Sequence, residues 1–462
     1  MGEPRRVEAL LSVDSVLGPG GAISAALERY EHRPEQLRVA HEVERAFDRR
    51  ELLLAEAGTG TGKTLAYLLP AILSGRKTVV STATKTLQEQ VFFKDVPLLR
   101  DRVGLQFNAA LLKGRSNYLC LQRFEQFGNA PEFASKEEAA LWPMLKSWAL
   151  KTDTGDRAEL ELPDNFSAWH ELSTTSETCL GQKCPLYEPC FVTRARRTAE
   201  DADVLVVNHH LFFADLALKG RGTRASEGVI PRYEAVIFDE AHALEDVAAE
   251  YFGASVSNFR FEDLVRDCLK ALETTSERGG MLSAIALQLR GRAELFFKSA
   301  AQRLRLGYSS SEATASLTAE SLAGLGAQAD ELVHTLQAIS AFASGAEEPE
   351  VLAVGRRATE VANDFDFIRT ADSLDHVFWA EARGRGLFLR AAPIEIAKEL
   401  RGRLYSAVDT VIFTSATLTA DGRFDFFAKR MGLRGEPDED TSAVREVRVD
   451  SPFDFPKQAA LY

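Results

Sequence analysis

Short aliphatic runs that end in polar residues recur along the chain. Their continuous apolar pattern is typical of buried strands in a parallel sheet, whose carboxyl ends deliver functional loops. Helical stretches lie between several of the runs, so we predict an α/β fold with helices on both faces of one sheet. The predicted strands cover residues 52–55, 78–81, 204–207, 235–238 and 410–414.

Long gaps between the polar motifs predict two insertions in this sheet. One lies between Thr64 and Asp239, and the other lies between His242 and Ser415. The second insertion has no proline between Arg232 and Glu348 and carries a helical apolar period, so we predict a helical domain. The residues expected on one helix face are Phe261, Leu264, Val265, Cys268, Leu269 and Leu272, and loops are expected at 309–311 and 344–350.

Composition limits the classes of protein that fit. A chain of 462 residues that is 45% hydrophobic can bury several cores, so about two to four domains are expected. The net charge of −13 excludes a protein that coats nucleic acid through bulk positive charge, so contacts with nucleic acid must be local. No run approaches the roughly 20 apolar residues of a membrane span, which predicts a soluble cytoplasmic protein with no membrane partner.

A glycine-rich loop between a predicted strand and a predicted helix is the first candidate site. Backbone amides of such a loop surround phosphate oxygens, Lys63 neutralises the β and γ phosphates, and Thr64 offers a hydroxyl to Mg²⁺. Strand, loop, Lys-Thr and helix together predict a P-loop nucleotide site in a RecA-like sheet, for ATP. Its residues are Ala57, where the common pattern has glycine, followed by Gly58, Thr59, Gly60, Thr61, Gly62, Lys63 and Thr64.

An acidic box follows the strand predicted at 235–238. Asp239 would hold Mg²⁺ through water, and Glu240 would orient and deprotonate the attacking water. We expect His242 to couple the nucleotide to neighbouring motifs. Together with Lys63, these three residues form the predicted catalytic set.

Two further segments agree with a nucleotide-driven enzyme. The side chains of Arg33 and Gln36 lie upstream of the phosphate loop and could read an adenine edge, although a plain helix start is the simpler reading. The segment 415–418 has the pattern of a motif that relays the state of ATP, although a turn between a strand and a helix would also account for it.

Four of the five cysteines fall in one pattern. Thiolates at these spacings can close around a [4Fe–4S] cluster or a tetrahedral zinc ion, and unrelated buried thiols are the bland alternative. The absence of closely spaced pairs favours the cluster slightly. Basic and aromatic residues such as Lys113, Arg115 and Tyr118 flank the pattern and suggest contacts with nucleic acid. The four are Cys120, Cys179, Cys184 and Cys190, whereas Cys268 is expected in a helical core.

Together these motifs resemble the iron–sulfur superfamily 2 DNA helicases, in particular the bacterial DinG and YoaA group related to XPD. The resemblance implies a motor domain with an iron–sulfur insertion and a helical arch, between which single-stranded DNA threads. It further implies 5′ to 3′ unwinding of tailed DNA in repair or replication stress, beside single-strand-binding or replication proteins. The matching segments are RPEQ at 33–36, AGTGTGKT at 57–64, STATKTLQEQ at 81–90, GRSNYLC at 114–120, VNHHL at 207–211, DEAH at 239–242 and TSATL at 414–418.

The resemblance also assigns residues. The four patterned cysteines would hold a [4Fe–4S] cluster, and Thr84, Lys85 and Arg115 would contact DNA. The expected place of work is the bacterial cytoplasm, at the nucleoid. The expected divisions are 1–115, 193–247 and 386–445 for the first motor domain, 116–192 for the cluster, 248–385 for the arch and 446–462 for the start of a truncated second motor domain.

Two rival functions follow from the same residues. If the second motor domain is missing, the chain alone would hydrolyse ATP weakly, and it could serve as a non-catalytic DNA-binding or regulatory module. An intact Lys63, Asp239 and Glu240 argue against that reading. An RNA helicase of the DEAH type is the other rival, and the cysteine pattern argues against it.

Overall fold

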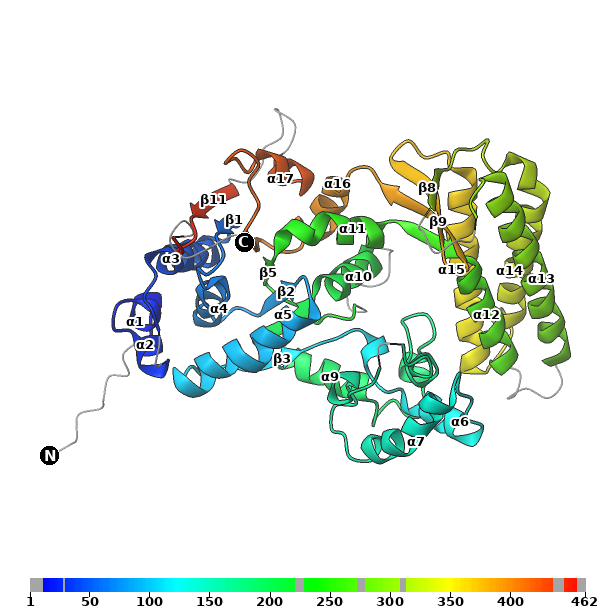
Figure 1. Cartoon of the computed structure of the whole chain (residues 1–462), viewed down its shortest axis with the longest axis horizontal. Helices are drawn as coiled ribbons and strands as arrows, with labels where there is room; N and C mark the ends of the chain where they lie inside the picture. The colour runs from blue at the N-terminus through cyan, green and yellow to red at the C-terminus, as the bar shows by residue number, and fades with distance from the viewer. Residues whose placement is uncertain are drawn as a thin grey trace, which may run out of the picture. The chain divides into compact units, whose positions relative to one another are not determined.

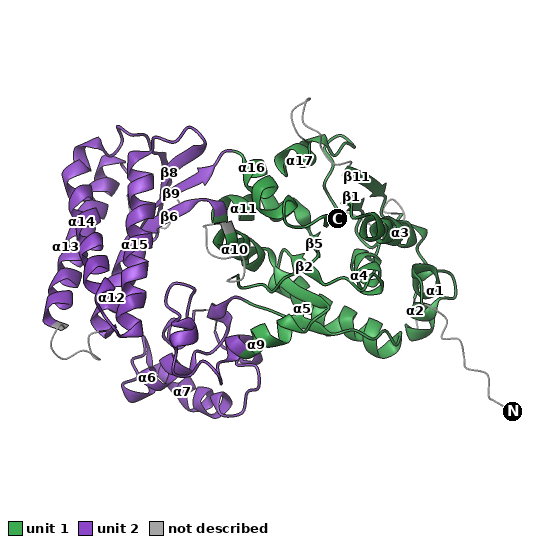
Figure 2. Ribbon diagram, turned by 180° about the vertical axis from the view of Figure 1, so that it is seen from behind, with its two compact units in different colours: residues 1–113, 194–251, 395–462 green, residues 114–193, 252–394 purple. Residues whose placement is uncertain are grey.

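The computed structural model describes residues 11–27, 30–163, 165–220, 228–271, 279–307, 313–434 and 444–454. The predicted loop at 309–311 and the helix position Leu272 lie outside these residues. The chain divides into two compact units, coloured separately in Figure 2. Unit 1 comprises Met1–Lys113, Arg194–Tyr251 and Glu395–Tyr462, and unit 2 comprises Gly114–Thr193 and Phe252–Ile394.

Unit 1 is built on a seven-stranded sheet whose strands all pair in parallel. The predicted α/β fold with a RecA-like parallel sheet is therefore confirmed, and the five predicted strands are all present. In spatial order the strands are β11 (Val444–Val449), β1 (Leu52–Ala57), β10 (Thr410–Ser415), β5 (Ala235–Asp239), β2 (Thr78–Thr82), β4 (Val204–Asn208) and β3 (Ala109–Leu111).

Helices cover both faces of this sheet (Figure 1). On one face α3 (Pro34–Arg49) packs on α4 (Lys63–Leu73), with Pro34 at its first turn and Val39, Val43 and Phe47 buried. The opposite face buries aromatic rings, among them Phe238, which stacks on Phe413. The other helices of this unit are α1 (Val13–Leu17), α2 (Ala22–Ala26), α5 (Lys85–Gln90), η1 (Val91–Asp95), η2 (Leu98–Arg102), α9 (Phe191–Glu200), α10 (His209–Gly220), η6 (Ala241–Ala243), α11 (Leu244–Phe252), α16 (Ile396–Leu400), η8 (Arg401–Tyr405) and α17 (Asp425–Arg430).

Unit 2 combines a helical bundle, a small sheet and the segment that carries the four patterned cysteines. The bundle helices α12 (Asn258–Ala271), α13 (Gly279–Arg303), α14 (Gly326–Ser344) and α15 (Pro349–Thr370) pack on one another around a common apolar core. The cysteine segment holds η3 (Arg115–Asn117), α6 (Leu121–Asn129), α7 (Lys136–Ala149), η4 (Arg157–Glu159), α8 (Trp169–Leu172) and η5 (Gly181–Lys183), while η7 (Ala323–Leu325) precedes α14.

The second insertion is not helical alone. It contains an antiparallel sheet in the order β6 (Ala254–Ser257), β9 (Gly386–Pro393), β8 (His376–Arg383) and β7 (Ala313–Ser316). The predicted boundary at 385 therefore falls inside the hairpin of β8 and β9. The predicted boundary at 446 falls inside β11, which pairs with β1 as part of the large sheet.

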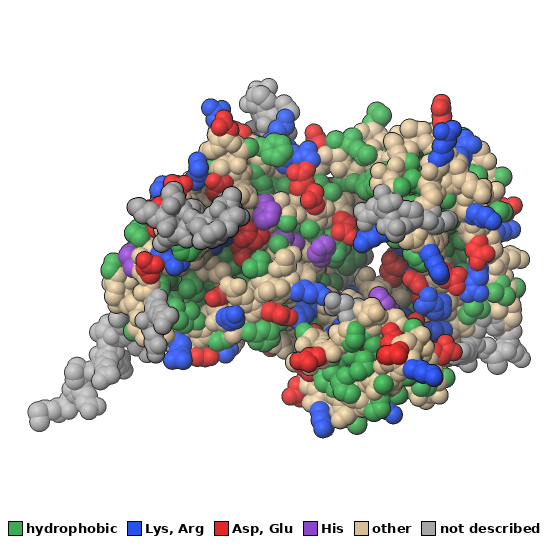
Figure 3. All heavy atoms as spheres, in the orientation of Figure 1, with side chains coloured by type: hydrophobic (Ala, Val, Ile, Leu, Met, Phe, Trp, Pro, Cys, Tyr) green, Lys and Arg blue, Asp and Glu red, His purple; other side chains and the backbone are tan. Residues whose placement is uncertain are grey.

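The helix face predicted in the second insertion is present in α12. Phe261, Leu264, Val265 and Cys268 are buried there, and Leu269 is partly buried against the same core. In the part of the chain that the structure describes, no helix is both long and apolar enough to cross a membrane. On the face seen in Figure 3, acidic and basic side chains are interspersed.

Candidate functional site

The phosphate loop joins the end of β1 to the first turn of α4. Gly60 and Gly62 adopt φ angles of +83° and +79°, which side chains rarely tolerate. A Cβ atom at Gly60 would overlap the ring of Phe453, and one at Gly62 would overlap the amide of Gln36. The loop therefore requires glycine at both positions, for conformation and for space.

Lys63 is the first residue of α4, so its ammonium group lies at the positive end of the helix dipole. Its Nζ lies 3.5 Å from Oε1 of Glu240 and 3.4 Å from the carbonyl oxygen of Ala57. The side chain of Lys63 is only 13% exposed, which keeps the charge beside the loop. Thr64 follows directly in the same first turn. The structure thus brings the predicted lysine next to the predicted water-activating glutamate.

Asp239 ends β5 and is buried, with an exposed fraction of 4%. Tyr67 Oη donates to its Oδ2 at 3.1 Å, and the backbone N–H of Glu240 donates to Oδ1 at 3.1 Å. Burial, followed by the charge of Glu240, raises the pKa of Asp239 from 3.8 to about 6, although Lys63 lowers it. A carboxyl group that is buried beside a second carboxylate favours a nearby cation, which fits the predicted role in binding Mg²⁺.

Glu240 has the left-handed backbone conformation, with φ of 56°, which is uncommon for a residue with a side chain. The hydroxyl of Ser415 donates to Glu240 Oε2 at 3.0 Å. Nδ1 of His242 lies 2.8 Å from the same hydroxyl. The acidic box and the segment 415–418 are therefore linked through one serine, as expected for a motif that relays the state of the nucleotide.

Gln36 and Arg33 contact the phosphate loop itself. The amide of Gln36 donates to the carbonyl of Gly62 at 2.9 Å and accepts from the Tyr30 hydroxyl at 3.0 Å. Only 3% of Gln36 is exposed, and Arg33 donates to the carbonyl of Gly60. The sequence suggested that these side chains read an adenine edge. In the structure both groups of the Gln36 amide are engaged within the protein, where they hold the loop.

The candidate DNA contacts fall in different units. Thr84 and Lys85 are exposed at the start of α5 in unit 1, where the Thr84 hydroxyl accepts from the N–H of Leu87 at 3.2 Å. Arg115 is half-buried in unit 2. Two neighbours that the sequence suggested as contacts with nucleic acid are buried: Lys113 is 5% exposed and pairs with Glu89, and Tyr118 is 4% exposed.

The four patterned cysteines all lie in unit 2, and each is partly buried. Burial raises the pKa of Cys120 and Cys184, and charge on Cys179 and Cys190 raises both further. Four thiolates are a suitable donor set for an iron–sulfur cluster. Among the described residues, no three His, Cys, Asp or Glu side chains are arranged as a metal-binding group.

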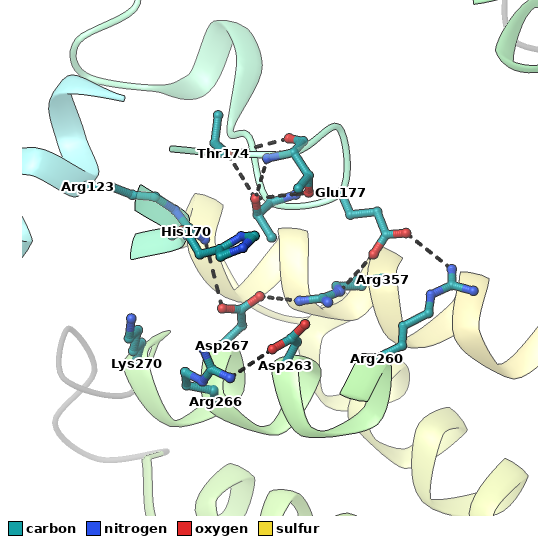
Figure 4. Close-up of polar contacts among 12 residues, drawn as sticks. Arg123, His170, Thr174, Glu177, Arg260, Asp263, Arg266, Asp267, Lys270 and Arg357 are labelled. Atoms are coloured by element: carbon teal, nitrogen blue, oxygen red, sulfur yellow. Dashed lines mark hydrogen bonds and ion pairs between the residues drawn. The ribbon is translucent and has the colours of Figure 1, made fainter. Parts of the chain in front are cut away.

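A network of charged side chains ties the cysteine segment to the helical bundle (Figure 4). Arg357 of α15 is only 7% exposed and donates from Nε to Glu177 Oε2 at 2.9 Å. It also pairs with Asp267 of α12. Arg260 of α12 lies 3.3 Å from Glu177 Oε1 and 2.7 Å from Asp364. Glu177 stands two positions before Cys179, so the bundle holds the chain close to a predicted cluster ligand.

Comparisons with known proteins bear directly on these features. A family model described as DEAD/DEAH box helicase matches residues 33–132. YoaA of Haemophilus influenzae, named an ATP-dependent DNA helicase, is 33% identical over 457 residues, covering 97% of this chain and 68% of YoaA. DinG of Mycobacterium tuberculosis, named an ATP-dependent helicase, is 30% identical, covering 96% of this chain and 67% of DinG.

The identity to YoaA, over more than two thirds of that protein, decides the family. The chain belongs to the YoaA and DinG family of ATP-dependent DNA helicases. The resemblance predicted from the motifs is thereby confirmed. A solved structure titled XPD helicase aligns with a TM-score of 0.45 and 16% identity, covering 91% of this chain and 62% of that one, so the chain spans less than two thirds of it.

Two residues of this YoaA and DinG family member belong to the site although no role was predicted for them. Tyr67 lies one turn after Lys63 in α4, and its hydroxyl donates to Asp239. Glu56 immediately precedes the loop, and its carboxylate binds the segment that follows β10. For Tyr67 the helical spacing of three from Thr64 was a usable signal. For Glu56 the sequence carried no such signal, because its partners Leu418 and Thr419 lie more than 300 residues away in the chain.

Proposed function

We propose that the protein couples ATP hydrolysis to 5′ to 3′ movement along single-stranded DNA, and that it unwinds tailed duplexes during repair or replication stress. One observation supports this most directly. Lys63, in the first turn of the helix that follows β1, converges with Asp239 and Glu240 at the carboxyl end of β5, in a member of the YoaA and DinG family. We place its work in the bacterial cytoplasm at the nucleoid, beside single-strand-binding or replication proteins.

The residues divide the work as follows. The backbone amides of the loop and Lys63 would bind the phosphates, while Thr64 and Asp239 would hold Mg²⁺. Glu240 would orient the attacking water and accept its proton. Ser415, which touches both Glu240 and His242, would transmit the change from ATP to ADP toward the segment that follows β10. Thr84 and Lys85 remain the proposed backbone contacts to DNA in unit 1, and Arg115 in unit 2.

ATP hydrolysis should be measured with single-stranded DNA, single-stranded RNA and no nucleic acid. We expect stimulation by DNA alone, and a Glu240→Gln variant that binds ATP but turns it over at least about a hundredfold more slowly. Unwinding is then compared on duplexes with a 5′ or a 3′ tail. Stimulation by RNA, or a preference for the 3′ tail, would contradict the proposal. A nucleotide-independent affinity for DNA without hydrolysis would favour a binding module instead.

We further propose that Cys120, Cys179, Cys184 and Cys190 hold a [4Fe–4S] cluster. Four thiolates in one unit support it, and the cluster would supply a rigid covalent cross-link within the insertion. The Cys120→Ser variant should lose iron and acid-labile sulfide, with the visible absorbance that accompanies them. Cys268→Ser is the matched control, because that thiol is buried in the bundle core. Stoichiometric zinc in a colourless, anaerobically purified protein would refute this assignment.

A further inference from the structure

Glu56 stands immediately before the phosphate loop, and its charged side chain is buried. It occupies the second-to-last position of β1, and 8% of the residue is exposed. A carboxylate at such a place is costly unless its oxygens are hydrogen-bonded, so its partners show what it holds.

Both oxygens of this carboxylate are occupied by groups from neighbouring strand ends. Oε2 accepts the backbone N–H groups of Leu418 at 2.7 Å and Thr419 at 2.6 Å. Oε1 accepts the hydroxyl of Thr419 at 2.8 Å and lies 3.1 Å from Nε of Arg448. Although burial raises the pKa of Glu56, these hydrogen bonds and Arg448 lower it overall, so the group is a carboxylate at neutral pH.

The position of β1 in the sheet explains this convergence. The strand lies between β10 and β11, and Glu56 stands opposite Ser415 in one register and Arg448 in the other. The chain after β11 then crosses the phosphate loop. Gly58 donates its N–H to the carbonyl of Val449 at 3.1 Å, and Ser451 Oγ donates to the carbonyl of Thr59 at 2.8 Å.

We infer that Glu56 is a positioning residue that fixes the segment Ser415–Thr419 and the end of β11 against the phosphate loop. Ser415 in turn contacts Glu240. A movement of the phosphate loop when ATP binds would therefore displace Glu56. Through its hydrogen bonds, Glu56 would displace the segment that contacts Glu240, the residue proposed to activate water. The inference rests on the proposed function, because it concerns how hydrolysis is coupled and not whether nucleotide binds.

Three variants separate the contacts. Glu56→Ala removes all of them, whereas Glu56→Gln keeps one oxygen for the two backbone N–H groups and loses the pair with Arg448. Glu42→Gln is the matched control, because Glu42 of α3 also pairs with an arginine of β11, Arg445. Each variant is assayed for the dissociation constant of an ATP analogue, for kcat and KM of ATP hydrolysis, and for hydrogen exchange of the amides of Leu418 and Thr419.

We expect Glu56→Ala to lower kcat about tenfold or more while the dissociation constant changes less than about threefold. Exchange at Leu418 and Thr419 should rise, and the analogue should no longer alter it. Glu56→Gln should recover most of the protection and part of kcat, and Glu42→Gln should match the parent.

Two results would overturn the inference. One is a Glu56→Ala protein with parental kcat and parental exchange. The other is a parallel loss of nucleotide binding and kcat in both Glu56 variants, which would mean that the carboxylate only maintains the loop. If the parent itself hydrolyses no ATP with DNA present, the proposed function fails, but the exchange measurement still decides whether Glu56 links the nucleotide to this segment.

Discussion

At the scale of single residues, the site keeps charge in places where an isolated charge would be unfavourable. Asp239 is buried, Glu240 has a left-handed backbone, and Lys63 is placed between the loop and Glu240. Without Mg²⁺ and nucleotide, this arrangement costs stability, because the two carboxylates repel each other in a poorly solvated site. Strain and desolvation of this kind are expected where a protein is organised to receive a charged ligand.

Asp239→Asn should therefore stabilise the ligand-free protein at pH 7. The pKa of Asp239 is raised from 3.8 to about 6, so its contribution to stability is complete below the lower value and is lost as the pH rises through the upper one. The asparagine removes this dependence, and we expect a gain of about 1–3 kcal/mol in the free energy of unfolding at pH 7. Urea titrations from pH 4 to pH 8 measure it.

The exposed Asp246, in the same region, provides the control. Asp246→Asn should change the free energy of unfolding by less than about 0.5 kcal/mol at either pH. A difference between Asp239→Asn and the parent that does not shrink toward pH 4 would contradict the explanation by burial.

At the scale of elements, the sequence predicted what local pattern determines and missed what depends on distant partners. The five aliphatic runs and the loop after β1 were predictable, because burial on both faces leaves a continuous apolar pattern. The sequence analysis predicted a domain boundary at 446, within the segment Val444–Val449, although this segment is one strand whose partner is β1. The hairpin of β8 and β9 was also missed, although Arg383, Gly384 and Arg385 form a readable turn signal, because helical periodicity dominated the insertion.

The charged network of unit 2 could not be predicted from the sequence either, because Glu177, Asp267 and Arg357 come from three separate segments. Without Arg357, Asp267 loses its short ion pair, whereas Glu177 keeps its pair with Arg260. We expect Arg357→Ala to lower the free energy of unfolding of unit 2 by about 1–3 kcal/mol, the cost of leaving a partly buried charged group without its partner. Chemical denaturation followed by the fluorescence of Trp169 and Trp142 would measure it.

Arg369→Ala is the matched control from the same helix. Its side chain is 25% exposed and pairs with Asp366 and Asp330, whose side chains are 50% and 55% exposed. Pairs of this kind contribute about 0–1 kcal/mol. Equal losses in the free energy of unfolding of the two variants would show that α15 tolerates no replacement of an arginine. They would contradict the explanation by the buried charge of Arg357.

At the scale of the whole molecule, the two units have separate cores and separate chemistry. All residues proposed to bind ATP lie in unit 1, and the patterned cysteines lie in unit 2. A ligand that binds one folded unit stabilises that unit by mass action. We therefore expect two thermal transitions, of which only that of unit 1 responds to Mg²⁺ and an ATP analogue.

At a ligand concentration about a hundredfold above the dissociation constant, the stabilisation is about 2.7 kcal/mol. For a unit of this size that corresponds to a rise of about 5–10 °C in the affected transition. Differential scanning calorimetry of the parent and of a Lys63→Ala variant would test this. A single thermal transition that shifts as a whole would contradict the proposal that ATP binds unit 1 only. So would a rise in transition temperature that persists in the Lys63→Ala variant.

The place of β1 in the sheet also matters for how the protein is made. This strand carries the phosphate loop, but both of its neighbours, β10 and β11, are synthesised only after the two insertions. At about 5–20 residues per second, the nascent chain must keep an apolar strand without its partners for roughly tens of seconds. Both insertions can fold during that interval. The nascent protein thus has an extended need for chaperone protection, and it completes its nucleotide site only after β10 and β11 have been made.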